Sequence, residues 1–314
     1  MTYTVDMNSE PRILVFGADG FIGTAISKEF SNFDSYLGLT RKDLDVCDYS
    51  KVKKCIMDFS PTIVINATGK VAGIQGNIDS PVNLMRDNSE NILSITKACH
   101  EMKIVKMIQF ASACIYPLNE FSASKPEDLG TGIIEETSKA YAISKIFGVE
   151  LFNSYRKQFG YQWSTIIPTN LYGVGDWNTG TNGHVIAMLT KKFIEAKQNK
   201  LPNVEVWGDG KSYRSFLNVI DLAAATKFFI SQDMFSNQVT NLNGEKEVSI
   251  YDLAYLIKNV TEYSGEIVFD ASKPNGARRK TLNDKSIRKL GWEPKISLSQ
   301  GITEYVKELE PLTL

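Results

Sequence analysis

The sequence is poor in histidine and cysteine and contains no long apolar run. Two histidines and four cysteines occur among 314 residues. The cysteines lack the spacing of metal ligands and no secretory signal precedes them, so we expect reduced thiols, no metal site and a cytoplasmic protein. No stretch of about 18 apolar residues occurs, so no membrane span is expected.

An excess of charge of one sign is also missing. The 35 Lys and Arg residues nearly balance the 36 Asp and Glu residues, for a net charge of -1. This balance gives no reason to expect nucleic acid or an anionic membrane as a partner. The apolar fraction of 43% and the charged fraction of 23% are ordinary for a soluble globular protein.

Short apolar runs alternate with amphipathic segments over the first half of the chain. The runs, which predict strands, lie at 12–16, 35–40, 62–66, 105–110 and 163–168. The amphipathic segments, which predict helices, lie at 24–30, 48–59, 88–103 and 141–159. Alternation of this kind predicts an α/β fold with a doubly wound parallel sheet, the Rossmann arrangement.

The pattern changes after Pro168. Four glycines between 170 and 183 indicate a loop. Later patterns predict helices at 185–197, 221–230, from 250 and from 298, and strands at 203–207, 213–219 and 266–269. We therefore expect residues 1–168 to form a dinucleotide-binding domain, to which 214–230 return. Residues 169–314 are expected to form mainly a smaller C-terminal substrate-binding domain, with the substrate in the cleft between the two.

Three glycines, Gly17, Gly20 and Gly23, follow the first predicted strand and open the first predicted helix. Glycine allows a tight turn and a close approach of the backbone to a pyrophosphate at the helix N-terminus. The alternative is a tight turn without a ligand. Their position in the first strand-helix unit favours a dinucleotide.

The end of the second predicted strand bears on the type of dinucleotide. An acidic residue there would bind an NAD ribose, but this chain has Arg41 and Lys42. A guanidinium suits a 2′-phosphate, so we expect NADP(H). Asp19, inside the glycine turn, argues against it because its charge lies near the phosphates. The alternative is two solvated basic residues.

Tyr141 and Lys145 lie four residues apart on a predicted helix and so share one face. A nearby ammonium would lower the pKa of the phenol, which could then exchange a proton with a carbonyl oxygen. A solvated helix face is the alternative. Ser112 and Cys114 follow the strand at 105–110, and an extended backbone would point both side chains the same way.

Cys114 and His184 could move protons on carbon. A keto group acidifies the neighbouring C–H bonds, and histidine, with a pKa of roughly 6.5, can act as the acid. Without further evidence Cys114 is a small buried hydrophobe, as are Cys47, Cys55 and Cys99. His184 is alternatively a structural residue at a helix start, and His100 lies on another predicted helix.

Several motifs together resemble those of the GDP-L-fucose synthase family, within the extended short-chain dehydrogenase/reductase superfamily. They span 111–117, 168–173, 183–186, 206–210, 214–217 and 269–274, and the resemblance covers nearly the whole chain from about Ile13. The family inverts C3 and C5 of GDP-4-keto-6-deoxymannose and then reduces C4 with NADPH. The chain departs from the family pattern at Asp19, where a basic residue is usual, and over 119–137.

The resemblance implies roles for individual residues. The reduction would involve Ser112, Tyr141 and Lys145, and the epimerisation Cys114 and His184. The cofactor would be held by Gly17, Gly20, Phe21, Ile22, Gly23, Arg41, Lys145 and Pro168. The GDP-sugar would be held by Asn170, Lys192, Trp207 and Arg214. The family also implies a homodimer through the helices at 88–103 and 141–159.

The sequence also allows other interpretations of these residues and of the function. From residue type alone, Trp207 is a core residue, Arg214 a surface arginine and Lys192 part of a solvated helix face. The enzyme could reduce C4 without epimerisation, on another GDP-4-keto sugar such as a GDP-heptose. A protein of a different class, a non-enzymatic dinucleotide sensor, would not need the intact pair of Tyr141 and Lys145.

Overall fold

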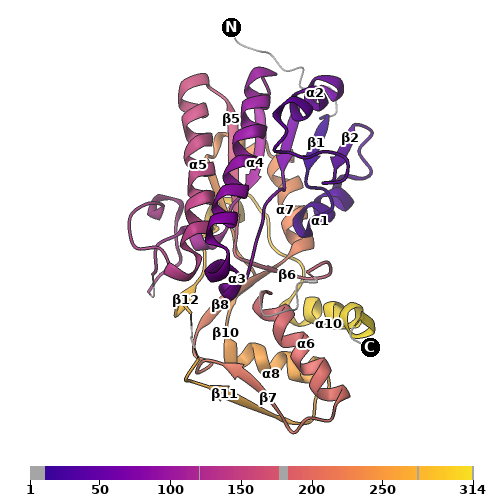
Figure 1. The fold of residues 1–314 in the computed structure, drawn as a ribbon, viewed down its shortest axis with the longest axis vertical. Helices are drawn as coiled ribbons and strands as arrows, with labels where there is room; N and C mark the ends of the chain where they lie inside the picture. Colours follow the sequence, from indigo (N-terminus) through magenta and orange to yellow (C-terminus); the bar gives the residue numbers. More distant parts are fainter. Residues whose placement is uncertain (1–10, 120, 177–182, 274–275, 313–314) are drawn as a thin grey trace.

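A six-stranded parallel sheet forms the centre of the first unit of the fold (Figure 1). The computed structural model describes residues 11–119, 121–176, 183–273 and 276–312. The strand order is β2-β1-β3-β4-β5-β9, and every neighbouring pair is parallel. The strands are β1 (Ile13–Phe16), β2 (Tyr36–Leu39), β3 (Ile63–Asn66), β4 (Lys106–Phe110), β5 (Gln162–Pro168) and β9 (Val239–Leu242).

Helices cover both faces of this sheet. One face packs against α1 (Phe21–Phe30) and α7 (Val219–Ser231), which contact each other. The other face packs against α2 (Tyr49–Phe59), α4 (Pro81–Glu101) and α5 (Lys139–Phe159). Strands buried on both faces need apolar side chains in both directions, which explains the uninterrupted apolar sequence of β1. The predicted doubly wound fold is confirmed.

The strand order reverses beside β1. From β1 the chain passes through α1 to β2 on one side, and then through α2 to β3 on the other side. The connections leave in opposite directions and open a crevice at the carboxyl ends of β1 and β3, where sheets of this type bind ligands. The glycine turn at 17–23 lies at this point.

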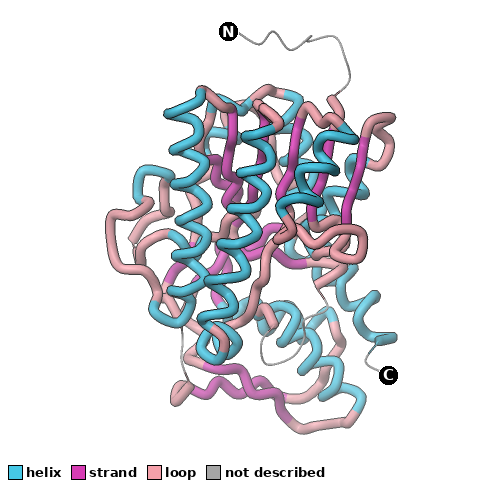
Figure 2. The backbone as a smooth tube through the Cα atoms, turned by 45° about the horizontal axis from the view of Figure 1, so that its top comes forward, coloured by secondary structure: helices cyan, strands magenta, loops and turns pink. Residues whose placement is uncertain are grey.

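The second unit is built from shorter sheets and helices (Figure 2). In one sheet, β8 (Tyr213–Asn218) pairs with β6 (Asn170–Tyr172), β10 (Glu247–Ser249) and β12 (Arg279–Lys280). A second sheet pairs β7 (Asn203–Trp207) with β11 (Glu266–Asp270). A separate core joins α6 (Val185–Gln198), α8 (Ile250–Val260) and α10 (Leu298–Leu309). The short α9 (Lys285–Arg288) instead packs on the first unit through Ile287.

Several elements differ from the sequence prediction. Strand β8 does not pair with the large sheet, whose last strand is the unpredicted β9. Helix α7 and Leu217 at the end of β8 do pack on the core of the first unit. Half of β9 is polar, with buried Thr240 and Asn241, so its sequence lacks an apolar pattern. Helix α4 begins at Pro81, and α3 (Ile74–Asp79) precedes it. Proline at the first helical position favours this early start. The division into two domains stays a prediction.

Within the described part of the chain, no helix combines the length and the apolar character that crossing a membrane requires.

Candidate active site

The glycine turn after β1 has room only for glycine at two positions. Gly17 has a φ of +80°, and the N–H of Gly20 donates to its carbonyl oxygen at 3.1 Å. A Cβ atom at Gly23 would lie 1.8 Å from the same oxygen. The first turn of α1 therefore lies directly against the end of β1, with no side chain between them.

This turn fits a dinucleotide pyrophosphate. Helix α1 begins at Phe21, and its N-cap, Gly20, has no side chain to occupy the first free N–H groups. Those N–H groups and the helix dipole favour a bound anion. Phe21 and Ile22 are the first two residues of α1, and Pro168 ends β5 in register with Leu242. Their predicted cofactor contacts stay predictions.

Two exposed basic residues follow β2, as the sequence predicts. Arg41 and Lys42 lie on a turn held by Asp43, whose carboxylate accepts from the N–H of Thr40 at 2.9 Å and from its hydroxyl at 2.7 Å. The turn keeps both cations at the carboxyl end of β2, beside the strand that leads into the glycine turn. Asp19 is also exposed, so its charge is largely screened by solvent.

Tyr141 and Lys145 lie at the start of α5, on the side of the sheet that α4 covers. Tyr141 is buried, and the Lys145 ammonium lies 5.7 Å from the centre of its ring. The ammonium donates to the carbonyl oxygen of Phe110, the last residue of β4, at 3.4 Å. The pair therefore faces the carboxyl end of the sheet.

The predicted lowering of the tyrosine pKa is wrong for this structure. Burial, and then the charge of Cys114, raise the pKa of Tyr141. Burial also lowers the pKa of Lys145 to about 8, although Cys114 opposes this change. Desolvation disfavours both charged forms and is the largest cause of both changes in pKa.

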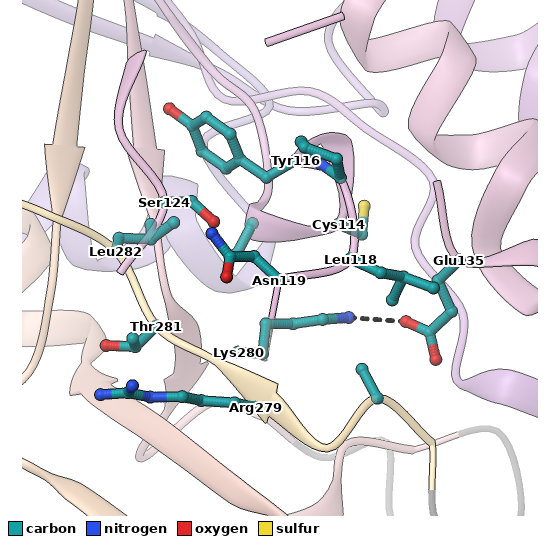
Figure 3. Close-up of a pocket in the computed structure, with 13 residues that line it drawn as sticks. Cys114, Tyr116, Leu118, Asn119, Ser124, Glu135, Arg279, Lys280, Thr281 and Leu282 are labelled. Atoms are coloured by element: carbon teal, nitrogen blue, oxygen red, sulfur yellow. Dashed lines mark hydrogen bonds and ion pairs between the residues drawn. The ribbon is translucent and has the colours of Figure 1, made fainter. Parts of the chain in front are cut away.

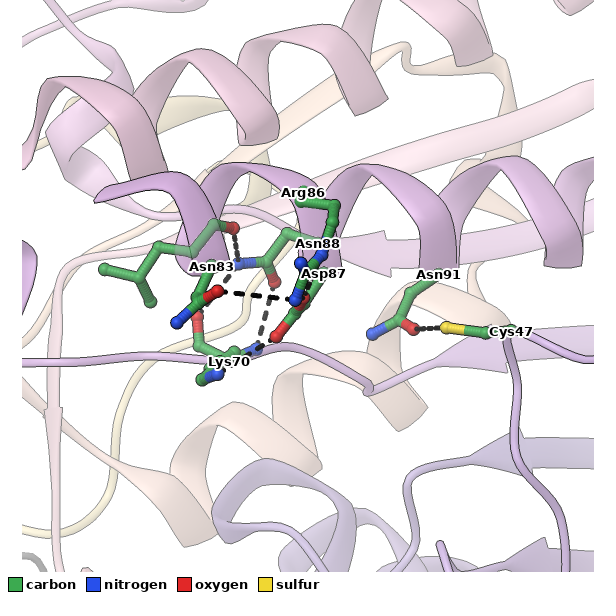
Figure 4. Close-up of polar contacts among 8 residues, drawn as sticks. Cys47, Lys70, Asn83, Arg86, Asp87, Asn88 and Asn91 are labelled. Atoms are coloured by element: carbon green, nitrogen blue, oxygen red, sulfur yellow. Dashed lines mark hydrogen bonds and ion pairs between the residues drawn. The ribbon is translucent and has the colours of Figure 1, made fainter. Parts of the chain in front are cut away.

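Asn88 of α4, which is not among the predicted site residues, holds the backbone at Lys70 (Figure 4). Its side-chain amide accepts from the N–H of Lys70 and donates to the Lys70 carbonyl, both at 3.0 Å. A Cβ atom at Gly69 would lie 3.1 Å from the Lys145 ammonium. In the sequence, the signal that could have identified Asn88 is an asparagine in line with the apolar residues Leu84 and Ile92 of the same helix.

Ser112 and Cys114 do not share an extended strand. Strand β4 ends at Phe110, and Ala113–Ile115 form a 3₁₀ helix, η1, because the chain turns as it leaves the sheet. The expected alternation of side chains is therefore wrong, yet the two residues still meet. The side chains of Ser112 and Lys145 both act on the buried Cys114 thiol and oppose the rise of its pKa.

Cys114 lies beside a small cavity of about 20 Å³ that is also lined by a half-buried ion pair (Figure 3). The Lys280 ammonium lies 2.8 Å from a carboxylate oxygen of Glu135. Burial raises the pKa of the Cys114 thiol; Lys280, Ser112 and Lys145 oppose this increase, while Glu135 adds to it. The thiol is therefore protonated near neutral pH.

His184 lies at the N-cap of α6, with Nδ1 3.0 Å from a carboxylate oxygen of Asp176. Among the described interactions, none joins His184 to Cys114. The other histidine, His100, packs on aromatic side chains and its Nδ1 lies 3.0 Å from the Tyr161 hydroxyl.

The remaining cysteines are only partly as predicted. Cys99 is buried and Cys55 is half-buried, but Cys47 is exposed. Its thiol donates to Asn91 at 3.0 Å, on the surface between the loop after β2 and α4 (Figure 4). The prediction of a buried Cys47 is therefore wrong. Among the described residues, no cluster of three or more His, Cys, Asp or Glu side chains could hold a metal.

The predicted substrate residues lie in the second unit. Trp207 is 54% exposed, so its interpretation as a core residue is wrong: along β7 alternate side chains point inward, and Trp207 is on the outer face. The Lys192 ammonium lies 5.9 Å from its ring and donates to the Glu205 carbonyl at 3.1 Å.

Arg214 and Asn170 lie on neighbouring strands. Arg214 is half-buried and stands in register with Lys280 of β12, so it is not an ordinary surface arginine. The amide of Asn170 donates to the Ser215 carbonyl at 2.9 Å. Glu135 acts electrostatically on Arg214 and so links this strand to the Cys114 cavity.

Comparison with known proteins decides the family. Residues 13–242 match the model of the "NAD dependent epimerase/dehydratase family". The chain belongs to this family. It is 35% identical over 306 residues to the GDP-L-fucose synthase of Escherichia coli, with 94% of this chain and 95% of the relative covered. It is also 30% identical over 295 residues to a GDP-L-colitose synthase of Yersinia pseudotuberculosis, covering 93% of this chain and 96% of the relative.

This epimerase/dehydratase-family member also resembles solved structures. A GDP-L-fucose synthetase from Naegleria fowleri bound to NADP has a TM-score of 0.84 and 26% identity, covering 97% of this chain and 95% of the other. A GDP-6-OMe-4-keto-L-xylo-heptose reductase from C. jejuni shares the fold, with a TM-score of 0.88, 24% identity and coverage of 98% and 99%. The chain is therefore an enzyme on the GDP-L-fucose synthase branch, which sets aside the non-enzymatic sensor.

Proposed function

We propose that this enzyme reduces C4 of a GDP-4-keto-6-deoxy sugar with NADPH, after inverting C3 and C5. The observation that carries the proposal is the grouping of Ser112, Cys114, Tyr141 and Lys145 at the carboxyl end of β4. Relatives named as GDP-L-fucose and GDP-L-colitose synthases support the substrate class, and the NADP-bound Naegleria structure supports the cofactor.

In the reduction, NADPH bound over the glycine turn supplies the hydride. Side chains of the protein orient the carbonyl, donate the proton and bind the cofactor. The Ser112 hydroxyl orients the C4 carbonyl, and Tyr141 gives its phenolic proton to the oxygen that becomes an alkoxide. The raised pKa of Tyr141 suits this role, because the phenol carries its proton when the substrate arrives. Lys145 holds the nicotinamide ribose.

In the epimerisation, each inversion removes one proton and returns one. The Cys114 thiol first gives its proton to solvent; the resulting thiolate takes the proton from carbon and becomes a thiol again, while the electron pair of the C–H bond moves into an enolate of the C4 keto group. His184 gives a proton to the opposite face of that carbon and becomes neutral. Exchange with solvent returns both groups to their starting forms, so atoms and charge balance.

The GDP group binds the second unit. The exposed face of Trp207 offers a stacking surface for a base, and Lys192 places a cation beside it. Arg214 offers a guanidinium to the diphosphate. Asn170 begins β6, two residues after the end of β5 at Pro168, where the chain passes from the large sheet to the sheet of β8 and where sugar and cofactor would meet.

A second candidate function is C4 reduction without epimerisation. The raised pKa of the Cys114 thiol favours it, because a protonated thiol is a poor base. The substrate would then be a GDP-4-keto sugar whose C3 and C5 already have their final configuration.

One incubation separates the two functions. The enzyme is mixed with NADPH and GDP-4-keto-6-deoxymannose in deuterated water, and the product is analysed by NMR. Loss of NADPH with deuterium at C3 and C5 supports the main proposal, whereas loss of NADPH without deuterium supports the second candidate. If NADPH is not consumed with this or other GDP-4-keto sugars, both are wrong.

The Tyr141→Phe variant tests the reduction itself. Loss of the phenolic proton donor is expected to lower kcat by roughly 10²–10⁴ without preventing folding. Tyr155→Phe, on the same helix but in the aromatic cluster around Trp163, is the matched control and should keep its activity. Equal activity of the two variants would contradict the assigned role of Tyr141.

The proposal includes a homodimer through α4 and α5. These helices pack side by side over one face of the sheet and expose apolar side chains, among them Val82 (70%), Leu93 (47%) and Phe147 (36%). Sedimentation should give twice the chain mass for the wild type and the single mass for Leu93→Asp. Leu201→Asp, at an exposed leucine outside these helices, is the control.

A further inference from the structure

A buried carboxylate lies against His184 and is not used in the proposed chemistry. The side chain of Asp176 is 6% exposed, and its Oδ2 lies 3.0 Å from Nδ1 of His184. An ionised carboxylate only accepts hydrogen bonds, so Nδ1 must carry the hydrogen. In the neutral imidazole, Nε2 is then the free nitrogen.

The fold fixes the position of Asp176 from several sides. Its N–H donates to the carbonyl of Gly173 at 3.1 Å, which closes a tight turn. Its carbonyl accepts from the hydroxyl of Tyr305, a buried residue of α10, at 2.5 Å. A hydrogen-bonded backbone on both sides leaves the carboxylate little freedom to move away from the imidazole.

The same turn reaches the cofactor side of the site. Gly175, with a φ of +101°, precedes Asp176, and a Cβ atom there would lie 3.5 Å from the ring of Phe21. Phe21 is the first residue of α1, directly after the glycine turn. The segment that carries Asp176 therefore packs on the element that receives the dinucleotide.

We propose that Asp176 is a positioning residue that accepts the Nδ1 hydrogen of His184 and so turns Nε2 toward the sugar. The inference rests on the proposed role of His184 as the proton donor. Asp176 keeps its charge throughout: when Nε2 gives its proton to carbon, the imidazole becomes neutral with the remaining hydrogen still on Nδ1. A proton from solvent then restores the imidazolium.

Electrostatics support this geometry. Burial alone would lower the pKa of His184, but the hydrogen bond and the negative charge of Asp176 outweigh burial and raise it above 6.5. Among the described residues, Asp176 is the charged group that contacts the imidazole, and the titratable Tyr305 contacts the backbone carbonyl of Asp176. The proton-donating form of His184 is therefore favoured nearer neutral pH.

Nitrogen NMR of the histidines tests the inference directly. The chain has only two histidines, so ¹⁵N-histidine labelling gives two imidazoles, and His100→Gln assigns them. We expect the neutral His184 to carry its hydrogen on Nδ1. In Asp176→Asn its pKa should fall by at least about half a pH unit. Asp209→Asn, at an exposed aspartate of the same unit, should leave that pKa unchanged.

Deuterium incorporation shows whether this positioning matters for chemistry. Asp176→Asn should slow incorporation at C3 or C5 by about 10–100-fold and shift its pH profile downward, while Asp176→Glu restores part of the rate. A merely structural role would not move the profile. The tautomer of His184 is measured on the wild-type protein, so it tests the positioning role of Asp176 even if Asp176→Asn fails to fold.

The outcomes distinguish a failure of the positioning role of Asp176 from a failure of the proposed epimerisation. Hydrogen on Nε2 of neutral wild-type His184, or a pKa that Asp176→Asn does not change, overturns the positioning role of Asp176 whether or not epimerisation occurs. The expected tautomer and pKa, together with wild-type enzyme that incorporates no deuterium, support the positioning of His184 and overturn the proposed epimerisation.

Discussion

Replacing Lys145 with methionine is expected to stabilise the cofactor-free enzyme while abolishing reduction. Burial lowers the pKa of Lys145 from 10.5 to about 8. Each pKa unit of this difference corresponds to about 1.4 kcal/mol, so a charged Lys145 destabilises the folded protein by up to about 3.5 kcal/mol. The side chain is only partly buried, and the variant loses the hydrogen bond to Phe110. We therefore expect a net gain of about 1–2 kcal/mol near pH 7.

The pH dependence of this gain follows from the direction of the pKa change. In the unfolded chain Lys145 titrates near 10.5, and in the folded protein near 8. Between these values the unfolded chain binds more protons, so raising the pH stabilises the wild type. The advantage of Lys145→Met should therefore be largest below pH 8 and shrink as the pH approaches 10.5.

Urea unfolding followed by tryptophan fluorescence, at about pH 7 and about pH 9.5, measures this difference. Lys157→Met, at an exposed lysine near the end of the same helix, is the control and should change stability by less than about 0.5 kcal/mol at either pH. A Lys145→Met variant less stable than wild type by more than about 1 kcal/mol, or a gain that grows with pH, would refute the reasoning.

Three further variants test other parts of the site. In Glu135→Gln the Cys114 thiol loses a neighbouring negative charge and keeps the Lys280 ammonium, so its pKa should fall and its alkylation at fixed pH should become faster; Glu136→Gln, at an exposed neighbour, should change neither. Arg41→Ser should raise KM for NADPH about 10–100-fold and leave KM for NADH unchanged, and an equal rise for both would contradict 2′-phosphate binding. In Gly23→Ala the new Cβ would meet a carbonyl oxygen at 1.8 Å, so thermal unfolding should show a loss of at least about 2 kcal/mol.

The sheet and the identity of its early strands followed from sequence because each strand is an apolar run between turn signals. β1 and β3 are buried throughout, so each is a continuous apolar run, which is too short for a helix and is bounded by turn signals. β9 belongs to the same sheet, at its edge, but half of it is polar, and the buried side chain of Asn241 accepts a hydrogen bond from the distant Tyr116 hydroxyl. Tertiary hydrogen bonds of this kind leave no local pattern.

The candidate site also has features that the sequence predicts and features that it does not. The meeting of Tyr141 with Lys145 follows from helical spacing, which is local. The electrostatics of that pair do not, because burial depends on the surrounding packing and dominates both pKa values. Asp176 is a further example: its contact with His184 depends on a turn and on Tyr305, which lies more than one hundred positions away in the sequence.

The place of β9 at the edge of the large sheet bears on how the chain folds during synthesis. Until residue 242 has left the ribosome, the outer edge of β5 exposes unpaired backbone groups that could pair with another chain. By then α6, β7 and β8 have already emerged. The cofactor-binding sheet is thus completed only after much of the substrate side exists, so a nascent chain does not present a finished dinucleotide site by itself.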